Sequence, residues 1–475
     1  MAAVAAAPRI ERDSIGERTL PTEAYYGVQT LRATENFPIT GRTCHPEMIR
    51  SIAQIKKAAA ITNRDLGLLP EDVAGAIIRA CDEIAEGELH DAFITDPIQG
   101  GAGTSFNMNA NEVIANRAIE LLGGTKGDYT LVSPNDHVNY GQSTNDVYPS
   151  AGKLAVLKVL MKAVAQLERL KGALEDKAAE FDDVIKMGRT QLQDAVPIRL
   201  GQEFHAYAQA VGRDIVRLTR AQDEVRSLNM GGTAVGTGLN ADVDYVKNIV
   251  PNLCAVTGLD LRQAEDLIDG TQNLDCYPAV SGAVKACAVT LSKMCNDLRL
   301  LSSGPRCGFG EIELPPRQNG SSIMPGKVNP VIPEVVNQVC FLIMGHDVTV
   351  TMAAEAGQME LNAFEPVIFN CLLESIESLD HAVGTLIDHC ILGIKANRER
   401  CQSLVDNSVG IITALTPHIG YQPAADLAKR AIHTGEPIRD ILLAEGTMDE
   451  ATLDRILEPV AMTTPGIAAE DLLKK

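Results

Sequence analysis

Apolar residues recur along much of this 475-residue chain with a period close to seven, which indicates long helices that pack side by side. Four runs show this period most clearly, at 160–181, 204–225, 280–301 and 372–390, and only the first is interrupted, at Lys171. Helices of about 25–30 residues would extend some 40 Å at about 1.5 Å per residue. Helices of this length need partners, so the pattern predicts a bundle.

A fifth segment, 333–354, is apolar on nearly every side, as Val335, Val336, Val339 and Phe341 illustrate. A helix with this composition is usually enclosed by other helices. Five long helices, one of them enclosed, therefore predict a mainly α protein with a central bundle. We also expect this bundle to pack against copies of itself and so form a larger helical bundle.

Shorter helical patterns flank the long ones. They cover 49–64, 71–86 and 112–122, and we expect Thr104 or Ser105 to cap the third. Residues 11–30 have no sustained period and should lie as an irregular segment over other elements. After Asn397, frequent glycine and proline predict a small C-terminal helical domain. The predicted domains are 1–141 (N-terminal, helical), 142–396 (long-helix bundle) and 397–475 (C-terminal, helical).

Composition narrows the classes of function. Aromatic residues make up 4% of the chain and tryptophan is absent, so aliphatic side chains must form the core. The formal net charge of −20 disfavours binding to nucleic acid or to anionic membranes. No uninterrupted apolar run reaches the length of a membrane span. The eleven cysteines lack disulfide or zinc spacing, which indicates free buried thiols and a cytoplasmic protein.

Candidate chemistry is concentrated in the segment 320–330, Gly-Ser-Ser-Ile-Met-Pro-Gly-Lys-Val-Asn-Pro. Two glycines, two prolines and several polar side chains cannot occupy a helix or a central strand, so the segment is predicted to be a loop. A phosphate-binding loop is excluded because Ser321 and Val328 occupy the positions that require glycine and a hydroxyl residue. The remaining alternative to a functional site is a surface loop with incidental serines.

Four more polar segments interrupt the helical patterns, at 99–109, 133–146, 186–197 and 231–238. The first is glycine-rich and precedes a helix, so its backbone N–H groups could bind a carboxylate, although a plain capped turn is the alternative. His137 lacks a partner at metal-ligand spacing and is interpreted as a loop histidine. The segment 231–238 lacks the context of a dinucleotide fold and is more typical of a tight turn.

Together these segments resemble the aspartase/fumarase superfamily, with several motifs in the family's order over nearly the whole chain. Its members eliminate across a carbon–carbon bond and release fumarate. The segments 25–32, 142–146 and 330–341 are similar to the aspartase branch, which deaminates L-aspartate through a carboxylate-stabilised carbanion. Class II fumarase typically has tryptophan in the first of these segments and is the alternative. A non-catalytic structural protein on the same scaffold, as in recruited lens proteins, is another.

The resemblance implies that Ser321 is the base that removes the Cβ proton, with its hydroxyl ionised by backbone donors of its own loop and by Lys327. It implies a homotetramer in which each site combines loops of three subunits, with no organic cofactor; activation by a divalent cation is left open. Gln191 replaces a histidine found in fumarases and some aspartases. Glu334 partners that histidine in the family, and starting the following helix is its alternative role. The implied substrate-binding residues are Thr104, Ser143, Thr144 and Ser322 for the reacting carboxylate, Thr190, Lys327 and Asn329 for the other carboxylate, and Asn145 and Gln191 for the amino group.

Overall fold

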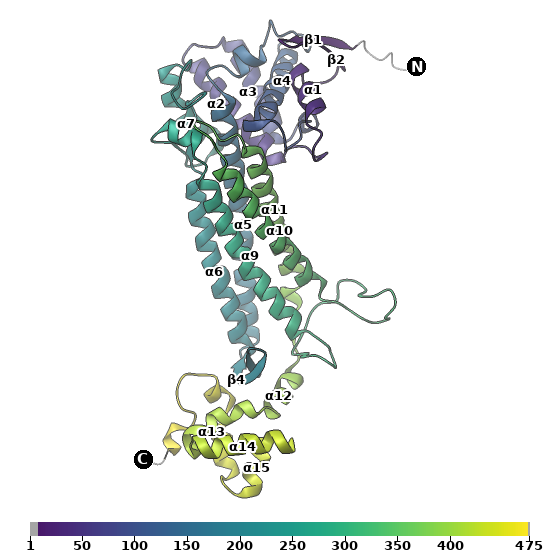
Figure 1. Ribbon diagram of the computed structural model, residues 1–475, viewed down its shortest axis with the longest axis vertical. Helices are drawn as coiled ribbons and strands as arrows, with labels where there is room; N and C mark the ends of the chain where they lie inside the picture. Colours follow the sequence, from purple (N-terminus) through teal and green to yellow (C-terminus); the bar gives the residue numbers. More distant parts are fainter. Residues whose placement is uncertain (1–7, 474–475) are drawn as a thin grey trace. The chain divides into compact units, whose positions relative to one another are not determined.

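The computed structural model describes residues 8–473, and helices dominate it (Figure 1). The mainly α fold predicted from the hydrophobic pattern is confirmed. The chain divides into two compact units, which are described separately. Unit 1 contains the chain up to Ala165, Val216–Ala288 and Val339–Asp380, and unit 2 contains Gln166–Ile215, Val289–Gln338 and the chain from His381 onward. The three predicted domain boundaries stay a prediction.

Five helices are much longer than the rest, as predicted: α5 (Thr144–Glu180), α6 (Leu200–Glu224), α9 (Cys276–Leu301), α10 (Val331–Glu355) and α11 (Glu365–His389). Each unit contains part of all five. Within unit 1, the Phe369 ring of α11 contacts Tyr148 of α5 and Tyr277 of α9, with centroids 5.4 and 5.2 Å apart. A Cβ atom on Gly152 would lie 2.0 Å from the Phe369 ring, so only glycine allows α5 and α11 to pack this closely.

The rest of unit 1 is a group of shorter helices around α2, which packs against α3 and α7, while α3 packs against α4 (Figure 1). The helices predicted at 49–64 and 71–86 are confirmed as α2 and α3. These elements are α1 (Val28–Asn36), α2 (Pro46–Asp65), α3 (Glu71–Glu86), α4 (Thr104–Leu121), α7 (Val243–Thr257), α8 (Leu267–Gln272) and the parallel strands β5 (Ser227–Leu228) and β6 (Arg262–Gln263).

The N-terminal segment is more regular than its sequence predicts. Strands β1 (Arg9–Asp13) and β2 (Gly16–Leu20) form an antiparallel hairpin. The Asp13 carboxylate accepts the backbone N–H groups of Ile15 and Gly16 and so fixes the turn of the hairpin. A turn of this kind depends on local hydrogen bonds, so the hydrophobic pattern does not predict it. The segment does lie over another element, since the Glu112 carboxylate of α4 accepts the backbone N–H groups of Gly27, Gln29 and Thr30.

Helix α10 is not enclosed within a single chain, which corrects the prediction from its composition. Phe341, Val348 and Met352 follow the heptad spacing along one face and are 60%, 59% and 64% exposed. By length and hydropathy α10 also passes the test for a membrane span, as core helices of soluble proteins do. However, its Asp347 carboxylate accepts hydrogen bonds from Ser281 and Lys285 of α9, which ties it into the bundle.

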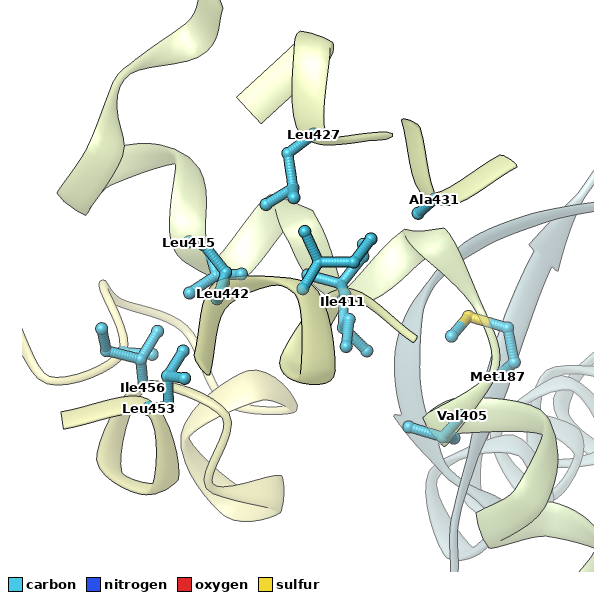
Figure 2. Packing of buried hydrophobic residues seen from close by; sticks show 12 residues of the cluster. Met187, Val405, Ile411, Leu415, Leu427, Ala431, Leu442, Leu453 and Ile456 are labelled. Carbon is cyan, nitrogen blue, oxygen red and sulfur yellow. The ribbon is translucent and has the colours of Figure 1, made fainter. Parts of the chain in front are cut away.

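Unit 2 combines a hairpin with a cluster of short helices. Figure 2 shows how Met187 of β3 joins Val405, Ile411, Leu415 and Leu442 in an apolar core. The elements are β3 (Ile185–Thr190), β4 (Gln193–Arg199), β7 (Ile312–Glu313), β8 (Lys395–Ala396), α12 (Arg398–Asp406), α13 (Ile412–Ile419), α14 (Tyr421–Thr434), α15 (Ile438–Glu445), α16 (Glu450–Ile456) and α17 (Pro459–Met462).

The segment 186–197, predicted as a polar loop, is the β3–β4 hairpin. Its turn is Gln191-Leu192, where both residues have positive φ, 53° and 63°. A two-residue turn of this hand matches the twist of paired strands, although neither residue type signals it in the sequence. The eleven cysteines, all within the described residues, form no disulfide, and eight of them are buried.

Candidate active site

The ten candidate residues lie in both units. Unit 1 contains Thr104, Ser143, Thr144 and Asn145, and unit 2 contains Thr190, Gln191, Ser321, Ser322, Lys327 and Asn329. All ten are partly or fully exposed, so each can reach a ligand. The structure of one chain therefore gives the geometry of each group of residues within its own unit.

Thr104 begins α4 but does not cap it. The capping residue is Gly103, in the left-handed conformation with φ of 77°, and a Cβ atom there would lie 2.4 Å from the Tyr148 ring. The Gln99 side chain accepts the N–H of Phe106 at 2.8 Å, the hydrogen bond that a capping hydroxyl would otherwise accept. The predicted cap at Thr104 or Ser105 is therefore wrong, because packing on Tyr148 fixes the start of α4.

Because the Thr104 side chain does not cap α4, it can line a cavity of about 540 Å³. The wall of this cavity also includes Ser105 and, from α1, Gln29 and Arg32. It lies at the N-terminal end of α4, where the free backbone N–H groups and the helix dipole favour an anion. The glycine-rich segment 99–103 thus leads to a hydroxyl at a helix start, beside a cavity.

Ser143 caps α5 in a reciprocal arrangement. Its hydroxyl accepts the N–H of Asn145 at 3.2 Å, and the Asp146 carboxylate accepts the N–H of Ser143 at 3.0 Å. The capping role predicted for hydroxyls in this segment is confirmed. The second oxygen of Asp146 accepts the N–H groups of Gly231 and Thr233, so the glycine-rich turn is fixed to the start of α5. Complete burial raises the pKa of Asp146 to about 6.

The next two residues are also held in place. Thr144 Oγ1 accepts a hydrogen bond from Asn107 of α4 at 3.1 Å. The side-chain amide of Asn145 donates to the backbone carbonyl of Ala234 at 2.7 Å. The backbone carbonyl of Asn145 accepts a hydrogen bond from the side-chain amide of Asn229 at 2.9 Å. Ser143, Thr144 and Asn145 therefore form a row of polar side chains with fixed orientations at the start of α5.

His137 lies in the same segment and has a local partner. Its Nδ1 atom accepts the backbone N–H of Ser133 at 3.0 Å, the geometry of the loop histidine that the sequence predicts. Within residues 8–473, no group of three or more His, Cys, Asp or Glu side chains is arranged to hold a metal ion.

In unit 2, Thr190 and Gln191 are exposed at the tip of the β3–β4 hairpin, and the preceding residue, Arg189, is strongly anchored. Arg189 Nη1 donates to both carboxylate oxygens of the fully buried Glu311, at 2.9 and 3.0 Å. The Arg189 guanidinium also lies 4.1 Å from the centroid of the Phe309 ring. The polar side chains of Thr190 and Gln191 therefore follow a residue that is held in place by Glu311 and Phe309.

The segment 320–330, which we call the flap, contains neither helix nor strand, as predicted. Two hydrogen bonds close its neck at 2.8 Å, from the N–H of Gly320 to the carbonyl of Lys327 and from the Asn329 side chain to the carbonyl of Gly320. A Cβ atom on Gly320 would lie 2.5 Å from the Lys327 carbonyl oxygen, so the neck requires glycine. Ile323, beyond the neck, is 83% exposed.

Inside the flap, the Ser321 hydroxyl oxygen accepts two backbone hydrogen bonds, from Ile323 at 3.2 Å and from Met324 at 3.0 Å. Donors that converge on one oxygen stabilise negative charge there and favour its ionised form. The exposed Lys327 belongs to the same flap. The flap therefore directs two backbone donors at the Ser321 oxygen.

Several residues that position the candidate site escape sequence reasoning, namely Gln99, Asn107, Asp146 and Glu311. Asn107 and Asn111 give one signal in retrospect, because buried amides in a helix need partners. Asp146 gives another signal, because Ser143 and Asp146 have the spacing of a reciprocal helix cap. Gln99 and Glu311 leave no such signal, because Gln99 binds a backbone group seven residues away and Glu311 binds a cation distant in sequence.

Comparison with known families gives two matches. The family described as "Lyase" matches residues 16–345, and the family described as "Fumarase C C-terminus" matches residues 411–464. The first match alone covers more than half of the chain.

Individual relatives agree with these matches. Proteins named aspartate ammonia-lyase from a Bacillus species and from Escherichia coli (strain K12) are 55% and 50% identical, and each alignment covers 97% of this chain and 98% and 97% of the relatives. Among solved structures, a fumarate lyase:delta crystallin from Brucella melitensis bound to cobalt has a TM-score of 0.94 at 49% identity, covering 96% of this chain and all of that one. A class II fumarase from Schistosoma mansoni has a TM-score of 0.92 at 37% identity, covering 96% and 99%. On these matches, the chain belongs to the lyase family that forms the aspartase/fumarase superfamily.

Proposed function

We propose that this protein is an aspartate ammonia-lyase, a carbon–nitrogen lyase that converts L-aspartate reversibly to fumarate and ammonia. Relatives of that name are 50–55% identical over nearly the full length. The single structural observation that supports the chemistry best is the pair of backbone N–H groups directed at the Ser321 hydroxyl oxygen. The proposed mechanism follows from that pair and from the fixed donors at the helix starts.

Ser321 acts as the base in this mechanism. Its ionised oxygen takes a proton from Cβ of L-aspartate, and the electron pair left on Cβ spreads onto the adjacent carboxylate. That pair then forms the carbon–carbon double bond as the Cα–N bond breaks and ammonia leaves. A general base of this kind contributes about 10²–10⁴-fold to the rate. The N–H groups of Ile323 and Met324, with Lys327, stabilise the ionised serine.

The intermediate carries an extra negative charge on its carboxylate, so donors must converge on those oxygens. Thr104, Ser143, Thr144 and Ser322 supply hydroxyls, and the first three stand at the starts of α4 and α5. Each such donor contributes about 2.7–4 kcal/mol to the transition state, by analogy with oxyanion holes. The fixed orientations of Ser143 and Thr144 reduce the reorganisation needed during the reaction.

The other end of the substrate is held by the remaining residues. Thr190, Lys327 and Asn329 bind the second carboxylate, and Asn145 and Gln191 orient the amino group. Asn329 donates one side-chain N–H to the carbonyl of Gly320 at the flap neck, and its other side-chain N–H donates to the substrate. Glu334 lies in the first turn of α10, where a carboxylate stabilises the helix start, and we assign it that role.

We propose a homotetramer in which each active site combines loops of three subunits. The apolar face of α10 at Phe341, Val348 and Met352 supports self-association, since an exposed row at heptad spacing is the seam of a helical bundle. The eleven free cysteines support a cytoplasmic location. Sedimentation of the purified protein tests the assembly, and a monomer at micromolar concentration would refute it.

Incubation with single substrates tests the activity. Purified protein mixed separately with L-aspartate and L-malate should release fumarate, followed by its ultraviolet absorbance, from L-aspartate alone. Release from L-malate alone would identify a class II fumarase, the alternative favoured by the 37% identical structure. Release from neither would indicate a non-catalytic protein on the same scaffold.

A further inference from the structure

The side chain of Lys56 is completely buried in the middle of α2, among Ile52, Ile55 and Ala59, which are also fully buried. Lysine is almost never fully buried without a partner, because removing the ammonium group from water costs several kcal/mol. A lysine kept at such a position therefore makes a contact that an apolar residue could not make.

The partners of Lys56 are neutral side chains in the segment that leads into α5. Its Nζ atom donates to Asn139 Oδ1 at 2.9 Å and to Gln142 Oε1 at 3.0 Å. Asn139 Oδ1 also accepts from Asn107 and Asn111 of α4, at 3.3 and 3.1 Å. One oxygen thus receives three donors, from α2 and α4, and fixes the segment to both helices.

This network reaches the candidate substrate-binding residues directly. Asn107 donates both to Asn139 Oδ1 and to Thr144 Oγ1, at 3.3 and 3.1 Å. Gln142, the second partner of Lys56, immediately precedes Ser143, and its carbonyl accepts from Asn139 at 3.1 Å. The positions of the Ser143 and Thr144 hydroxyls therefore depend on the contacts of Lys56.

Two ionisable groups on other helices interact electrostatically with Lys56. The ionisable groups that face it from neighbouring elements are Asp146 of α5 and Cys81 of α3, and burial lowers the pKa of Lys56 to about 7. Asp146 in turn accepts the N–H groups of Ser143, Gly231 and Thr233. The start of α5 is thus held by a lysine that binds side-chain oxygens and an aspartate that binds backbone N–H groups.

We propose that Lys56 is a positioning residue for catalysis, which sets the Ser143 and Thr144 hydroxyls against the reacting carboxylate through Asn139 and Gln142. The inference rests on the proposed function of these hydroxyls. It assigns a role in the reaction to a residue that contacts neither substrate nor the reacting atoms.

A substitution pair with a matched control tests this role in the full-length enzyme. Lys56→Met keeps the length and apolar stem but loses both hydrogen bonds. It should lower kcat/KM for L-aspartate by about 10²-fold, as displacement of positioned groups by about 1 Å does. The loss should lie mainly in kcat, because the hydroxyls bind most strongly to the transition state. Lys57→Met is the control, since Lys57 pairs only with Asp82 near the surface, and it should stay within about twofold of the wild type.

The coupling between Lys56 and Asn139 separates positioning from general stability. If Lys56 acts through Asn139, the double variant Lys56→Met/Asn139→Leu should be no slower than the slower single variant. The loss should also persist well below the unfolding temperature, where a defect of stability alone would disappear. Multiplicative effects of the two substitutions, or an unchanged kcat/KM in Lys56→Met, would overturn the proposal.

If Lys56→Met does not assemble, Gln142→Met serves as the second variant, because it removes one partner of Lys56 and leaves Asn139 in place. A drop in kcat of about tenfold or more supports the role, and an unchanged kcat overturns it. Failure of the proposed function is distinguishable, since the wild-type protein would then release no fumarate from L-aspartate.

Discussion

The start of α5 and the flap carry complementary parts of the proposed site and are built in opposite ways. At the start of α5, Ser143, Thr144 and Asn145 are fixed by buried charged and amide side chains, including Asp146 and Asn107. The flap has neither helix nor strand, is held by hydrogen bonds at its neck and by local backbone bonds to Ser321, and is exposed beyond the neck. The difference supports a division of labour in the proposed site, with preorganised donors in one region and the proposed base in an exposed loop in the other.

Removing the base should have the largest effect. Ser321→Ala should lower kcat by about 10³–10⁴-fold, near the upper end of general-base contributions, while the fold stays intact because Ser321 lies in the exposed flap. Fumarate release under saturating L-aspartate measures it. Undiminished turnover would reject Ser321 as the base and with it the contrast between the regions.

Removing one donor should have the next largest effect. Thr104→Val keeps the shape of an exposed side chain but loses its hydroxyl, and it should reduce kcat by about 10²–10³-fold with little change in thermal stability. Initial rates over a range of L-aspartate concentrations separate kcat from KM. A change in KM alone would mean that Thr104 binds substrate and transition state equally.

Two glycines with similar backbone conformations compare the packing of the flap with that of the start of α4, which lies against Tyr148 of α5. Gly103 has φ of 77° and lies against the Tyr148 ring, whereas Gly326 of the flap has φ of 81°, and a Cβ atom added there would meet no heavy atom within 4 Å. Gly103→Ala should lower the free energy of unfolding by about 3 kcal/mol, from overpacking added to backbone strain. Gly326→Ala should cost only about 1 kcal/mol, from backbone strain alone.

Thermal or denaturant unfolding of both variants gives the comparison. Equal losses would show that the start of α4 is as loosely packed as the flap and would contradict the division of labour. A larger loss in Gly326→Ala than in Gly103→Ala would reverse it.

The smallest effect is expected from pH. Burial raises the pKa of Glu365, at the start of α11 in unit 1, to about 8 from an ordinary value of 4.5. The folded state therefore holds a proton that the unfolded state has released between about pH 4.5 and 8. Stability contributed by this group falls as pH rises through that window.

Glu365→Gln should raise the thermal midpoint by about 2 °C at pH 8 relative to the wild type, and the gain should shrink toward pH 5. The flap contains no Asp or Glu, so Ser322→Ala is the control and should show no such dependence. A gain that is equal at both pH values would contradict the raised pKa.

The sequence predicts the parts of this molecule that depend on periodic burial or on turn residues. Heptad spacing predicts four of the long helices, an apolar composition on nearly every side predicts the fifth, and glycine and proline mark the flap. The β3–β4 hairpin is missed because Gln191 and Leu192 adopt positive φ without being typical turn residues. The cap of α4 is missed because contact between Gly103 and Tyr148 decides it, and that contact depends on tertiary structure.

The candidate site divides in the same way. Motif residues such as Ser321 and Thr144 become candidates because the polar segments that contain them resemble those of a known family. Lys56, which helps to hold Thr144, lies inside a helical pattern where periodicity indicates only a buried position. Asn107 lies in the polar segment 99–109, where nothing distinguishes it from its polar neighbours. The exposed face of α10 differs from its predicted enclosure because a single chain supplies no partner for Phe341, Val348 and Met352.

A crystal structure of the assembled protein with a bound dicarboxylate tests the central claim most directly. We predict that the Ser321 oxygen lies about 3–3.5 Å from the substrate carbon that loses its proton, with the Thr104, Ser143 and Thr144 hydroxyls on the adjacent carboxylate. A closed, liganded site in which another side chain occupies the position next to that carbon, with Ser321 directed elsewhere, would contradict it.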